Sequence, residues 1–406
     1  MSKNLVIVES PHKAKTLEKY LGADYRVLAS QGHVRDIEGV GKNSLGIDFE
    51  NNYQPNYVID TQKEHLIETL RTESQKADTV WLASDEDREG EAIAWHLKEV
   101  LKLPTEKTRR IVFHEITESA IHQAIENPRD IDYNLVNAQQ ARRVMDRIVG
   151  FELSPILWKK VTTGLSAGRV QSVAVRLIVE KEREIESFFP TYQYRITADF
   201  TGKNPGDASV LHTELNTRFS TKREALEFLE HCQRAQFRVE SVQKKPGHRS
   251  PAPPFTTSSL QQEAARKLKF SVSKTMRLAQ SLYEAGRITY MRTDSVNLSS
   301  LAINTAKAEI ISEYGEQYSR VRQYHTSSKG AQEAHEAIRP TYMNVREAGS
   351  NPDEKRLYEL IRKRTIACQM ADADVETTRV EVSVSDSPYL FIKTHQHRDG
   401  CEIAFL

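Results

Sequence analysis

The sequence predicts a multidomain protein of mixed α/β and α+β class, in which a parallel-sheet domain precedes helical domains and part of a β-rich domain. In residues 1–131, apolar strand patterns alternate with helical patterns, which is typical of a parallel sheet with helices on both faces. Helical patterns fill residues 132–187, and strand patterns around the helix TKREALEFLEHC fill residues 188–247. The length of 406 residues agrees with two to four domains of ordinary size.

The parallel-sheet domain shows a strand followed by a helix three times. LVIVES (5–10) is an apolar run typical of a buried strand, and Ser10 and Pro11 are expected to cap and begin the helix PHKAKTLEKYL. TVWLAS (79–84) predicts a second strand, followed by an acidic turn and the helix EGEAIAWHLKEVL. IVFHE (111–115) predicts a third strand, and the next residues predict a helix, ESAIHQAIE, that begins after a threonine cap.

The remainder of the chain divides at a proline-rich linker. HRSPAPPFTT (248–257) holds three prolines and no apolar period, so it predicts a loop. Helical patterns follow to about residue 375, and RVEVSVS (379–385) resumes a strand pattern. We therefore assign residues 248–377 to a further helical domain and residues 378–406 to returning strands.

Composition excludes several classes of protein. Hydrophobic residues make up 38% and charged residues 28%, which is typical of soluble globular domains and not of disordered chains. No apolar run approaches the ~20 residues of a transmembrane helix, and the N-terminus lacks the pattern of a signal peptide. The three cysteines form no CxxC pair, so we exclude a zinc ribbon within this chain and expect a reducing cytoplasm.

Charge is distributed unevenly along the chain. Residues 78–99 have a net charge of −5, whereas residues 141–176 and residues 260–292 each have a net charge of +5. One acidic block and two basic blocks fit a metal site beside a track for a polyanion. From charge alone, ordinary solvated helix faces are the favoured interpretation.

Alternating carboxylates follow the second predicted strand. Asp85, Asp87 and Glu89 lie in SDEDREGE, and alternate side chains of an extended turn point the same way. Glu9 ends the first strand and is expected to join them, because ligands bind beyond the carboxyl ends of parallel strands. Such oxygen ligands suit Mg²⁺, with Mn²⁺ or Ca²⁺ as substitutes. An acidic turn alone is more often a solvated loop, but its combination with Glu9 is more specific.

These strings resemble a known domain. VESPHKAK with SDEDREGEAIAWHL resembles the Toprim domain, which type IA topoisomerases share with other DNA enzymes. The resemblance implies a Rossmann-like parallel sheet with a metal site in residues 1–131. The family usually has Thr-Asp-Pro at the acidic turn, where this sequence has Ser84, Asp85 and Glu86. The first change keeps a hydroxyl, and the second adds a charge.

The string GRITYMRTDS (286–295) holds the candidate nucleophile, Tyr290. A lone tyrosine is nearly always a packing or surface residue. A tyrosine hydroxyl has a pKa near ~10, and a nearby cation lowers it. Arg292 follows by two residues, so in an extended segment both side chains project to one face. The full string resembles the active-site motif of type IA DNA topoisomerases. The resemblance implies that Tyr290 attacks the backbone to form a 5′-phosphotyrosine link and a free 3′-hydroxyl, while Arg292 steadies the phosphate.

The same resemblance implies roles for further residues. Lys13 is expected near the scissile phosphate, and Glu9 is a candidate general acid for the leaving 3′-oxygen. His335, in GAQEAHEAIRP, is a candidate to bind or protonate near that phosphate, although a lone helix histidine is more often structural. His33, in SQGHVRD, matches a DNA contact of the family.

Residues 139–176 resemble the helical DNA-binding segment of the family along their whole length. Arginines offer guanidinium groups to phosphates, small residues permit close backbone approach, and an acid one turn away from an arginine holds it in place. Phe151 and Trp158 are equally consistent with base stacking and with core packing. The candidate DNA contacts are His33, Arg142, Arg143, Asp146, Phe151, Trp158, Ser166, Ala167, Gly168, Arg169, Val170, Gln171 and Arg292.

The resemblance implies an isomerase that relaxes negatively supercoiled DNA at single-stranded regions, as a monomer near the nucleoid and without ATP. We find no G-x-x-x-x-G-K-[ST] motif, and a tyrosine–DNA bond stores the energy for rejoining. A Toprim nucleotidyltransferase such as a primase is the rival enzyme class, against which Tyr290 and GLSAGRVQS argue.

The final stretch, SPYLFIKTHQHRDGCEIAFL, matches nothing in the family, so we expect a truncated product. In that case residues 188–247, the first part of a β arch, would lack sheet partners. The alternative function is then a DNA-binding fragment with cleavage but little or no relaxation activity.

Overall fold

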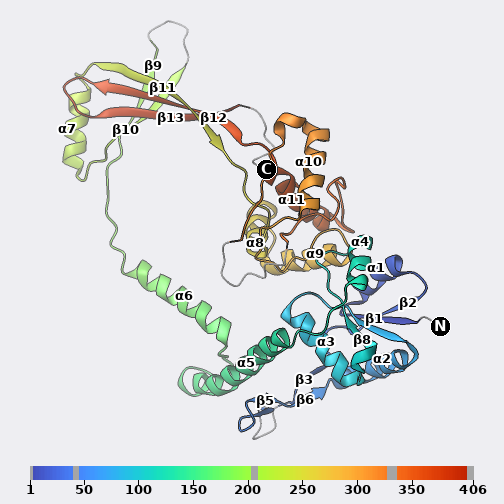
Figure 1. Cartoon of the computed structure of the whole chain (residues 1–406). Coiled ribbons are helices and arrows are strands. Elements are labelled where there is room, and N and C mark those ends of the chain that lie inside the picture. The colour runs from blue at the N-terminus through green and yellow to red at the C-terminus, as the bar shows by residue number, and fades with distance from the viewer. Residues whose placement is uncertain (1–2, 40–44, 203–208, 327–335, 400–406) are drawn as a thin grey trace. The chain divides into compact units, whose positions relative to one another are not determined.

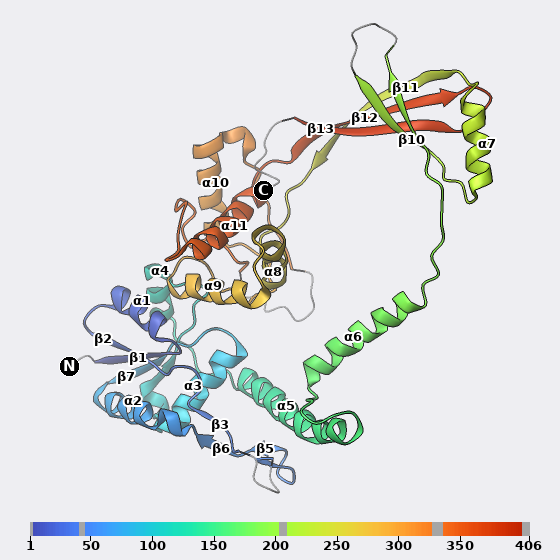
Figure 2. The ribbon, with the colours of Figure 1, turned by 180° about the vertical axis from the view of Figure 1, so that it is seen from behind.

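The chain folds into two compact units. The computed structural model describes all residues except 1–2, 40–44, 203–208, 327–335 and 400–406 (Figures 1 and 2). Unit 1 comprises residues 1–181, 253–309 and 322–366, and unit 2 comprises residues 182–252, 310–321 and 367–406.

A four-stranded parallel sheet begins unit 1, as the sequence predicted. Its strand order is β2-β1-β7-β8, with β1 (Asn4–Val8), β2 (Tyr25–Ala29), β7 (Thr79–Leu82) and β8 (Thr108–Arg110). Alternate β1 side chains are buried on opposite faces of the sheet, as they must be when both faces are covered.

Two helices cover each face of this sheet (Figure 1). Helices α1 (Pro11–Leu21) and α4 (Glu118–Glu126) pack on the face that carries Val6. Helices α2 (Glu64–Lys76) and α3 (Arg88–Leu101) pack on the face that carries Leu5. The expected two-sided covering of the sheet is therefore confirmed.

The predicted helix caps are present. Ser10 Oγ accepts the Lys13 N–H at 3.1 Å, with Pro11 as the first residue of α1, and Thr117 caps α4. Asp87 caps α3 by accepting the Gly90 N–H at 2.8 Å, so a candidate site residue also fixes a helix start.

The strand predicted at residues 111–115 is wrong. Strand β8 ends at Arg110. The Ile111 N–H still donates to Leu82 O of β7, and no strand continues through residues 112–115. The His114 carbonyl accepts the Tyr290 N–H at 2.8 Å, so its hydrogen bond goes to the tyrosine segment and not to a neighbouring strand. This departure brings the edge of the sheet to the tyrosine.

Several short elements of unit 1 carry no periodic signal in the sequence. Two small antiparallel sheets pair β3 with β6 and β4 with β5. These elements are β3 (Arg35–Ile37), β4 (Ile47–Asp48), β5 (Gln54–Pro55), β6 (Tyr57–Ile59), η1 (Thr61–Lys63) and η2 (Thr105–Lys107).

Two long helices occupy most of the segment predicted to be helical after the sheet. They are α5 (Tyr133–Lys160) and α6 (Arg169–Glu186). Helix α5 packs against α3, and Val136 shares the buried cluster that lies beneath α2 and α3. This contact places the basic residues of α5 near the acidic start of α3.

The segment that carries Tyr290 packs on the α1 face of the sheet. Phe255, Leu278 and Ile288 belong to the same buried cluster as Val8 and Leu17. The elements that follow the linker are α8 (Thr257–Glu263), η3 (Ala264–Leu268), α9 (Val272–Glu284), α10 (Ser300–Tyr314), η4 (Glu316–Tyr318) and α11 (Pro352–Cys368). Helices were expected to about residue 375, but α11 ends at Cys368.

Unit 2 contains a five-stranded antiparallel sheet and helix α7. Its order is β11-β12-β13-β10-β9, and α7 (Lys222–Cys232) begins with a capping box. The strands are β9 (Thr197–Thr201), β10 (Val210–Leu215), β11 (Phe237–Arg249), β12 (Ala373–Val384) and β13 (Leu390–Asp399). The expectation that residues 188–247 lack sheet partners is wrong, because β12 and β13 pair with β11 and β10.

Among the described residues, no helix combines the length and the apolar character that crossing a bilayer demands.

Arg110, at the end of β8, fixes the turn that carries Asp85. The residue is 1% exposed, and its guanidinium group donates to the carbonyls of Leu82 at 3.1 Å, Ser84 at 2.7 Å and Asp85 at 2.9 Å. It also pairs at 3.2 Å with Glu91, which is fully buried. Buried charges need such partners, because leaving them unpaired is costly.

We expect Arg110→Met to lower the free energy of unfolding by ~3 kcal/mol. The substitution removes the donor of several buried carbonyls and a charged partner of Glu91. Urea unfolding followed by circular dichroism measures the change. Arg176→Met is the control, because Arg176 is 77% exposed in its pair with Glu180 and such pairs contribute at most ~1 kcal/mol. Equal effects of the two substitutions would contradict this role for Arg110.

Candidate active site

Tyr290 lies in a loop segment between α9 and α10 that is held on both sides. Its N–H donates to His114 O at 2.8 Å, and the neighbouring Thr289 N–H donates to Arg339 O at 2.9 Å. Gly286 begins the segment with a φ of +68°, and a Cβ there would lie 2.5 Å from Ile116 O. Glycine is required at this close approach.

The Tyr290 phenol is buried against a carboxylate. The side chain is 4% exposed, and its hydroxyl donates to Asp87 Oδ2 at 2.5 Å. Arg292 Nη1 lies 3.5 Å from the same oxygen, while the Tyr283 ring packs edge-on at 5.2 Å. The structure thus brings Tyr290 and Arg292 together with Asp87, which lies 203 positions before Tyr290 in the chain.

The pKa of Tyr290 is raised well above its ordinary value. Burial is the largest cause, the charges of Asp85 and Asp87 add to it, and Arg292 opposes it. Arg292 lowers this pKa, as the sequence predicted, but burial and the two carboxylates outweigh it. The phenol keeps its proton here and donates it in a hydrogen bond.

Lys13 connects Glu9, which follows β1, with Asp85, which lies in the turn after β7. Its ammonium group is 1% exposed and lies 2.8 Å from Asp85 Oδ1 and 3.1 Å from both Glu9 oxygens. Tyr283 donates to the same Asp85 oxygen at 3.1 Å, and Glu9 Oε1 accepts the Asp85 N–H at 2.9 Å. The described cluster therefore contains two carboxylates, one ammonium group and one phenol.

Burial raises the pKa of Glu9 to about 8, with Lys13 opposing the rise and Asp85 adding to it. Burial by itself would lower the pKa of Lys13, but the charges of Asp85 and Glu9 outweigh burial and raise it. We conclude that Lys13 stays charged while Glu9 can hold a proton near neutral pH.

The four candidate metal ligands line one cavity without converging on one point. Glu9, Asp85, Asp87 and Glu89 line a cavity of about 590 Å³, together with Arg292. Within the described residues, no group of three His, Cys, Asp or Glu side chains is close enough to hold a metal ion. The expected convergence of four carboxylates is therefore not seen. One or two carboxylates still fit a hard cation that takes its other ligands from water and phosphate.

Glu89 lines that cavity but pairs with candidate DNA contacts. It lies 3.5 Å from His33 and accepts from Gln139 Nε2 at 3.1 Å. Hydrogen bonding to His33 is the largest cause that lowers the pKa of Glu89 to about 2. Arg142 lies 3.7 Å from Glu89 and 3.9 Å from Asp146, so the expected pair with Asp146 is present.

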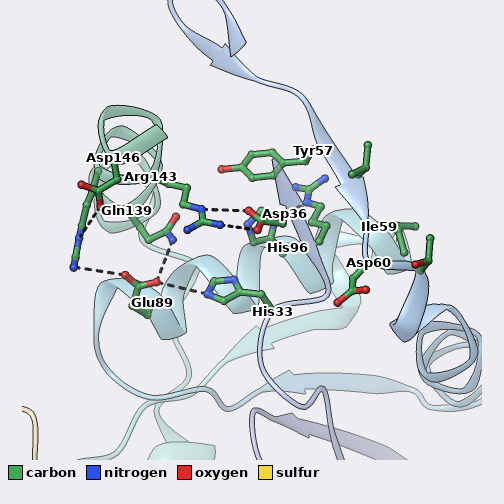
Figure 3. A pocket seen from close by; sticks show the side chains of 14 residues that line it. His33, Asp36, Tyr57, Ile59, Asp60, Glu89, His96, Gln139, Arg143 and Asp146 are labelled. Atoms are coloured by element: carbon green, nitrogen blue, oxygen red, sulfur yellow. Dashed lines mark hydrogen bonds and ion pairs between the residues drawn. The ribbon is translucent and has the colours of Figure 1, made fainter. Parts of the chain in front are cut away.

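A second cavity, of about 700 Å³, adjoins these residues (Figure 3). His33, Glu89, Arg142 and Asp146 line it, and Arg143 Nη2 meets Asp36 there at 2.6 Å. The cavity therefore collects several candidate DNA contacts on α5 and near the start of α3.

Residues that sequence reasoning missed complete the wall of this cavity. The Arg35 guanidinium lies over Tyr57 at 5.0 Å and over Trp95 at 4.5 Å, and its Nε donates to His96 Nδ1. Burial, followed by the charges of Arg35 and His33, lowers the pKa of His96 to about 3. These contacts join residues that are far apart in the sequence, so no local motif predicted them.

Phe151 and Trp158 have accessible faces. They are 43% and 48% exposed, so core packing is not their role here. The Arg147 guanidinium lies 5.1 Å from the Phe151 ring. The exposed rings remain candidates for base stacking.

The glycine-rich turn before α6 is internally bonded. Gln171 Nε2 donates to Ser166 O at 2.7 Å, and the Ala167 N–H donates to Ser154 Oγ at 3.1 Å. Arg169 Nε meets Asp146 Oδ1 at 2.8 Å, which ties α6 to α5. Gly168 lies at the turn's end, and Val170 is 63% exposed on α6.

His335 lies outside the described residues, so its predicted role stays a prediction. Tyr283 was missed because it occupies an apolar position of α9, where a tyrosine is expected to pack in the core. His114 was missed because it was assigned to a strand.

Comparisons with known proteins agree with this geometry. A family model described as DNA topoisomerase matches residues 130–400, and one described as Toprim domain matches residues 4–116. DNA topoisomerase 1 of Synechocystis sp. is 47% identical, over 96% of this chain and 47% of that protein. Full-length topoisomerase I from Thermotoga maritima is 40% identical with a TM-score of 0.83, over 97% of this chain and 66% of that chain. The chain thus spans about half the length of this curated relative.

The buried His96 predicts a pH dependence of stability. Between its ordinary pKa of 6.5 and its folded value of about 3, the unfolded chain binds a proton that the folded chain does not. Stability therefore falls as pH drops through this window, by at most ~1.4 kcal/mol per pH unit. Urea midpoints at pH 7 and pH 5.5 measure the slope.

His96→Asn keeps an acceptor for Arg35 but binds no proton, so we expect it to reduce that slope. His65→Asn, at an exposed position of α2, is the control and should keep the slope of the parent chain. An unchanged slope in His96→Asn would show that His96 is not the titrating group.

Proposed function

The chain belongs to the type IA DNA topoisomerase family, and from this premise we propose that it breaks and rejoins one DNA strand through Tyr290. The observation that carries the proposal is the Tyr290 hydroxyl on Asp87, beside the cluster of Lys13, Glu9 and Asp85. The proposed activity is relaxation of negatively supercoiled DNA by a transient 5′-phosphotyrosine link and strand passage.

In the cleavage step, the Tyr290 oxygen attacks phosphorus and its proton passes to Asp87, which already accepts its hydrogen bond at 2.5 Å. The bond from phosphorus to the 3′-oxygen breaks, and that oxygen takes a proton from Glu9. The raised pKa of Glu9, about 8, suits this general acid. Lys13 and Arg292 place positive charge near the phosphate.

Rejoining reverses each of these transfers. The 3′-hydroxyl attacks the phosphotyrosine, its proton returns to Glu9, and Tyr290 recovers its proton from Asp87. One phosphoester is exchanged for another in both directions, so we propose that no ATP is consumed.

Toprim domains suggest use of a divalent metal, and we propose Mg²⁺, with Mn²⁺ or Ca²⁺ as substitutes. Asp85 and Asp87 would hold it, with Glu9 and Glu89 in the same cavity. A bound Mg²⁺ supplies positive charge against the negative charge that develops on the phosphate.

We propose single-stranded regions of DNA as the substrate. Arg142, Arg143 and Arg169 offer guanidinium groups for phosphates, and the exposed faces of Phe151 and Trp158 suit unpaired bases. Each of these arginines has an acidic partner, which holds it in position. We further propose that the protein acts as a monomer in a bacterial cytoplasm, where such DNA is found.

Tyr290→Phe should abolish the covalent protein–DNA complex, because phenylalanine has no nucleophilic oxygen. The parent chain and the variant are incubated with labelled single-stranded DNA and Mg²⁺, denatured, and resolved on a gel. DNA affinity in a mobility-shift assay should remain within about threefold, because the arginines are untouched.

Tyr192→Phe is the matched control, since Tyr192 is 79% exposed, and it should form the complex normally. If the covalent band persists in Tyr290→Phe, Tyr290 is not the nucleophile. Extension of DNA by added nucleotides, without any covalent band, would favour the rival nucleotidyltransferase.

Asp87→Asn should weaken divalent-metal binding by more than about tenfold. Substituting a residue that only hydrogen-bonds to a metal ligand already lowers metal affinity by about tenfold or more. Asparagine caps a helix as well as aspartate does, so the fold should be retained. Mn²⁺ binding by electron paramagnetic resonance, with and without an oligonucleotide, gives the affinity. Asp24→Asn, at an exposed position, is the control, and equal affinity in all three chains would contradict the site.

A further inference from the structure

Glu86 lies between the two aspartates of the acidic turn, and the function proposed above gives it no role. It is also one of the two positions, with Ser84, at which this turn departs from the Thr-Asp-Pro pattern named above. Its carboxylate turns to His114, with Oε2 and Nδ1 3.0 Å apart. The two side chains are 21% and 34% exposed, so the pair is mostly shielded from water.

His114 is also bound to the tyrosine segment by its backbone. Its carbonyl accepts the Tyr290 N–H at 2.8 Å. The acidic turn is therefore connected to Tyr290 itself by two routes, besides the 3.5 Å contact of the nearby Arg292 with Asp87. One is direct, from the Tyr290 hydroxyl to Asp87, and the other runs through Glu86 and His114.

The residues after His114 brace the same segment. Glu115 pairs with Arg339 at 3.0 Å, and the Ile116 carbonyl lies where a Cβ on Gly286 would collide. The backbone around His114 is thus held against the tyrosine segment, while its side chain reaches the acidic turn.

The two routes differ in what survives the proposed cleavage step. Once the Tyr290 oxygen is bonded to phosphorus, it has no hydrogen to donate, so its bond to Asp87 is lost. The Tyr290 N–H and the Glu86–His114 pair take no part in that chemistry. The second route then still ties the acidic turn to the tyrosine backbone. The 3.5 Å contact of Arg292 with Asp87 also remains, but it lies among the groups proposed to act on the phosphate, whereas the Glu86–His114 pair does not.

We propose that the Glu86–His114 ion pair is a positioning device that holds the acidic turn beside Tyr290 while the tyrosine is bonded to DNA. The inference rests on the proposed function. Glu86 and His114 are positioning residues, because they act on Asp87 and Tyr290 and not on the phosphate. The pair therefore favours rejoining, in which the acidic turn must act again, more than it favours the initial cleavage.

The test measures rejoining and cleavage separately, with the full chain, Mg²⁺ and a labelled oligonucleotide. Glu86→Gln and His114→Gln remove the charges of the pair with little change in size. Each should slow single-turnover rejoining by about fivefold, and the double variant should be no slower than either single variant, since both break one link. Cleavage rate and DNA affinity should change less than about twofold.

Two further variants separate positioning from general structure. Glu86→Asp keeps the charge on a shorter side chain and should restore part of the rejoining rate. Asp353→Asn breaks the Lys274–Asp353 pair, which has comparable exposure at 34% and 37%, and should leave rejoining unchanged. Melting temperatures of all variants report the fold.

Rejoining at the parent rate in Glu86→Gln, or additive effects in the double variant, would overturn the inference. An equal slowing of cleavage and rejoining would also overturn it, because that is the behaviour of a merely structural pair. If His114→Gln does not fold, Glu86→Gln and Glu86→Asp carry the same test with the same outcomes. If the parent chain itself forms no covalent complex, the proposed function fails instead, which is a distinguishable result.

Discussion

The burial of one ammonium group between two carboxylates is the interaction on which the site depends. Lys13 comes from α1, Glu9 from the end of β1, and Asp85 from the turn after β7. A buried ammonium group without partners is costly, so the three elements are held together at the carboxyl edge of the sheet. The parallel strands bring those chain segments to one edge, and the charge pairing then fixes their side chains.

Burial also governs the state of the nucleophile. The Tyr290 segment packs on the α1 face of the sheet, in the same apolar cluster as Leu17 and Ile116. That packing removes water from the phenol, and the nearby carboxylates add to the rise of its pKa. The described site thus holds a protonated tyrosine on the base that is proposed to accept its proton. Positive charge from a bound divalent metal would oppose the effect of the same carboxylates on the phenol.

Sequence patterns predicted the long elements and their starts. The apolar run of β1, the cap at Ser10 and the cap at Thr117 are local features, and each is found in the structure. The strand expected at residues 111–115 is wrong, because the His114 carbonyl pairs with Tyr290, 176 positions later in the chain. The short strands β3 to β6 were not predicted, because a strand of two or three residues is too short to show an alternation of apolar and polar residues.

The sequence by itself determined which residues are candidates, because motifs such as GRITYMRTDS and SDEDREGE are local strings. Only the tertiary structure decided what each candidate faces. Glu89 faces His33 and Gln139, and Glu86 faces His114. The physical reason is that burial and pairing depend on distances between segments that are remote in the chain. Local spacing does not encode those distances.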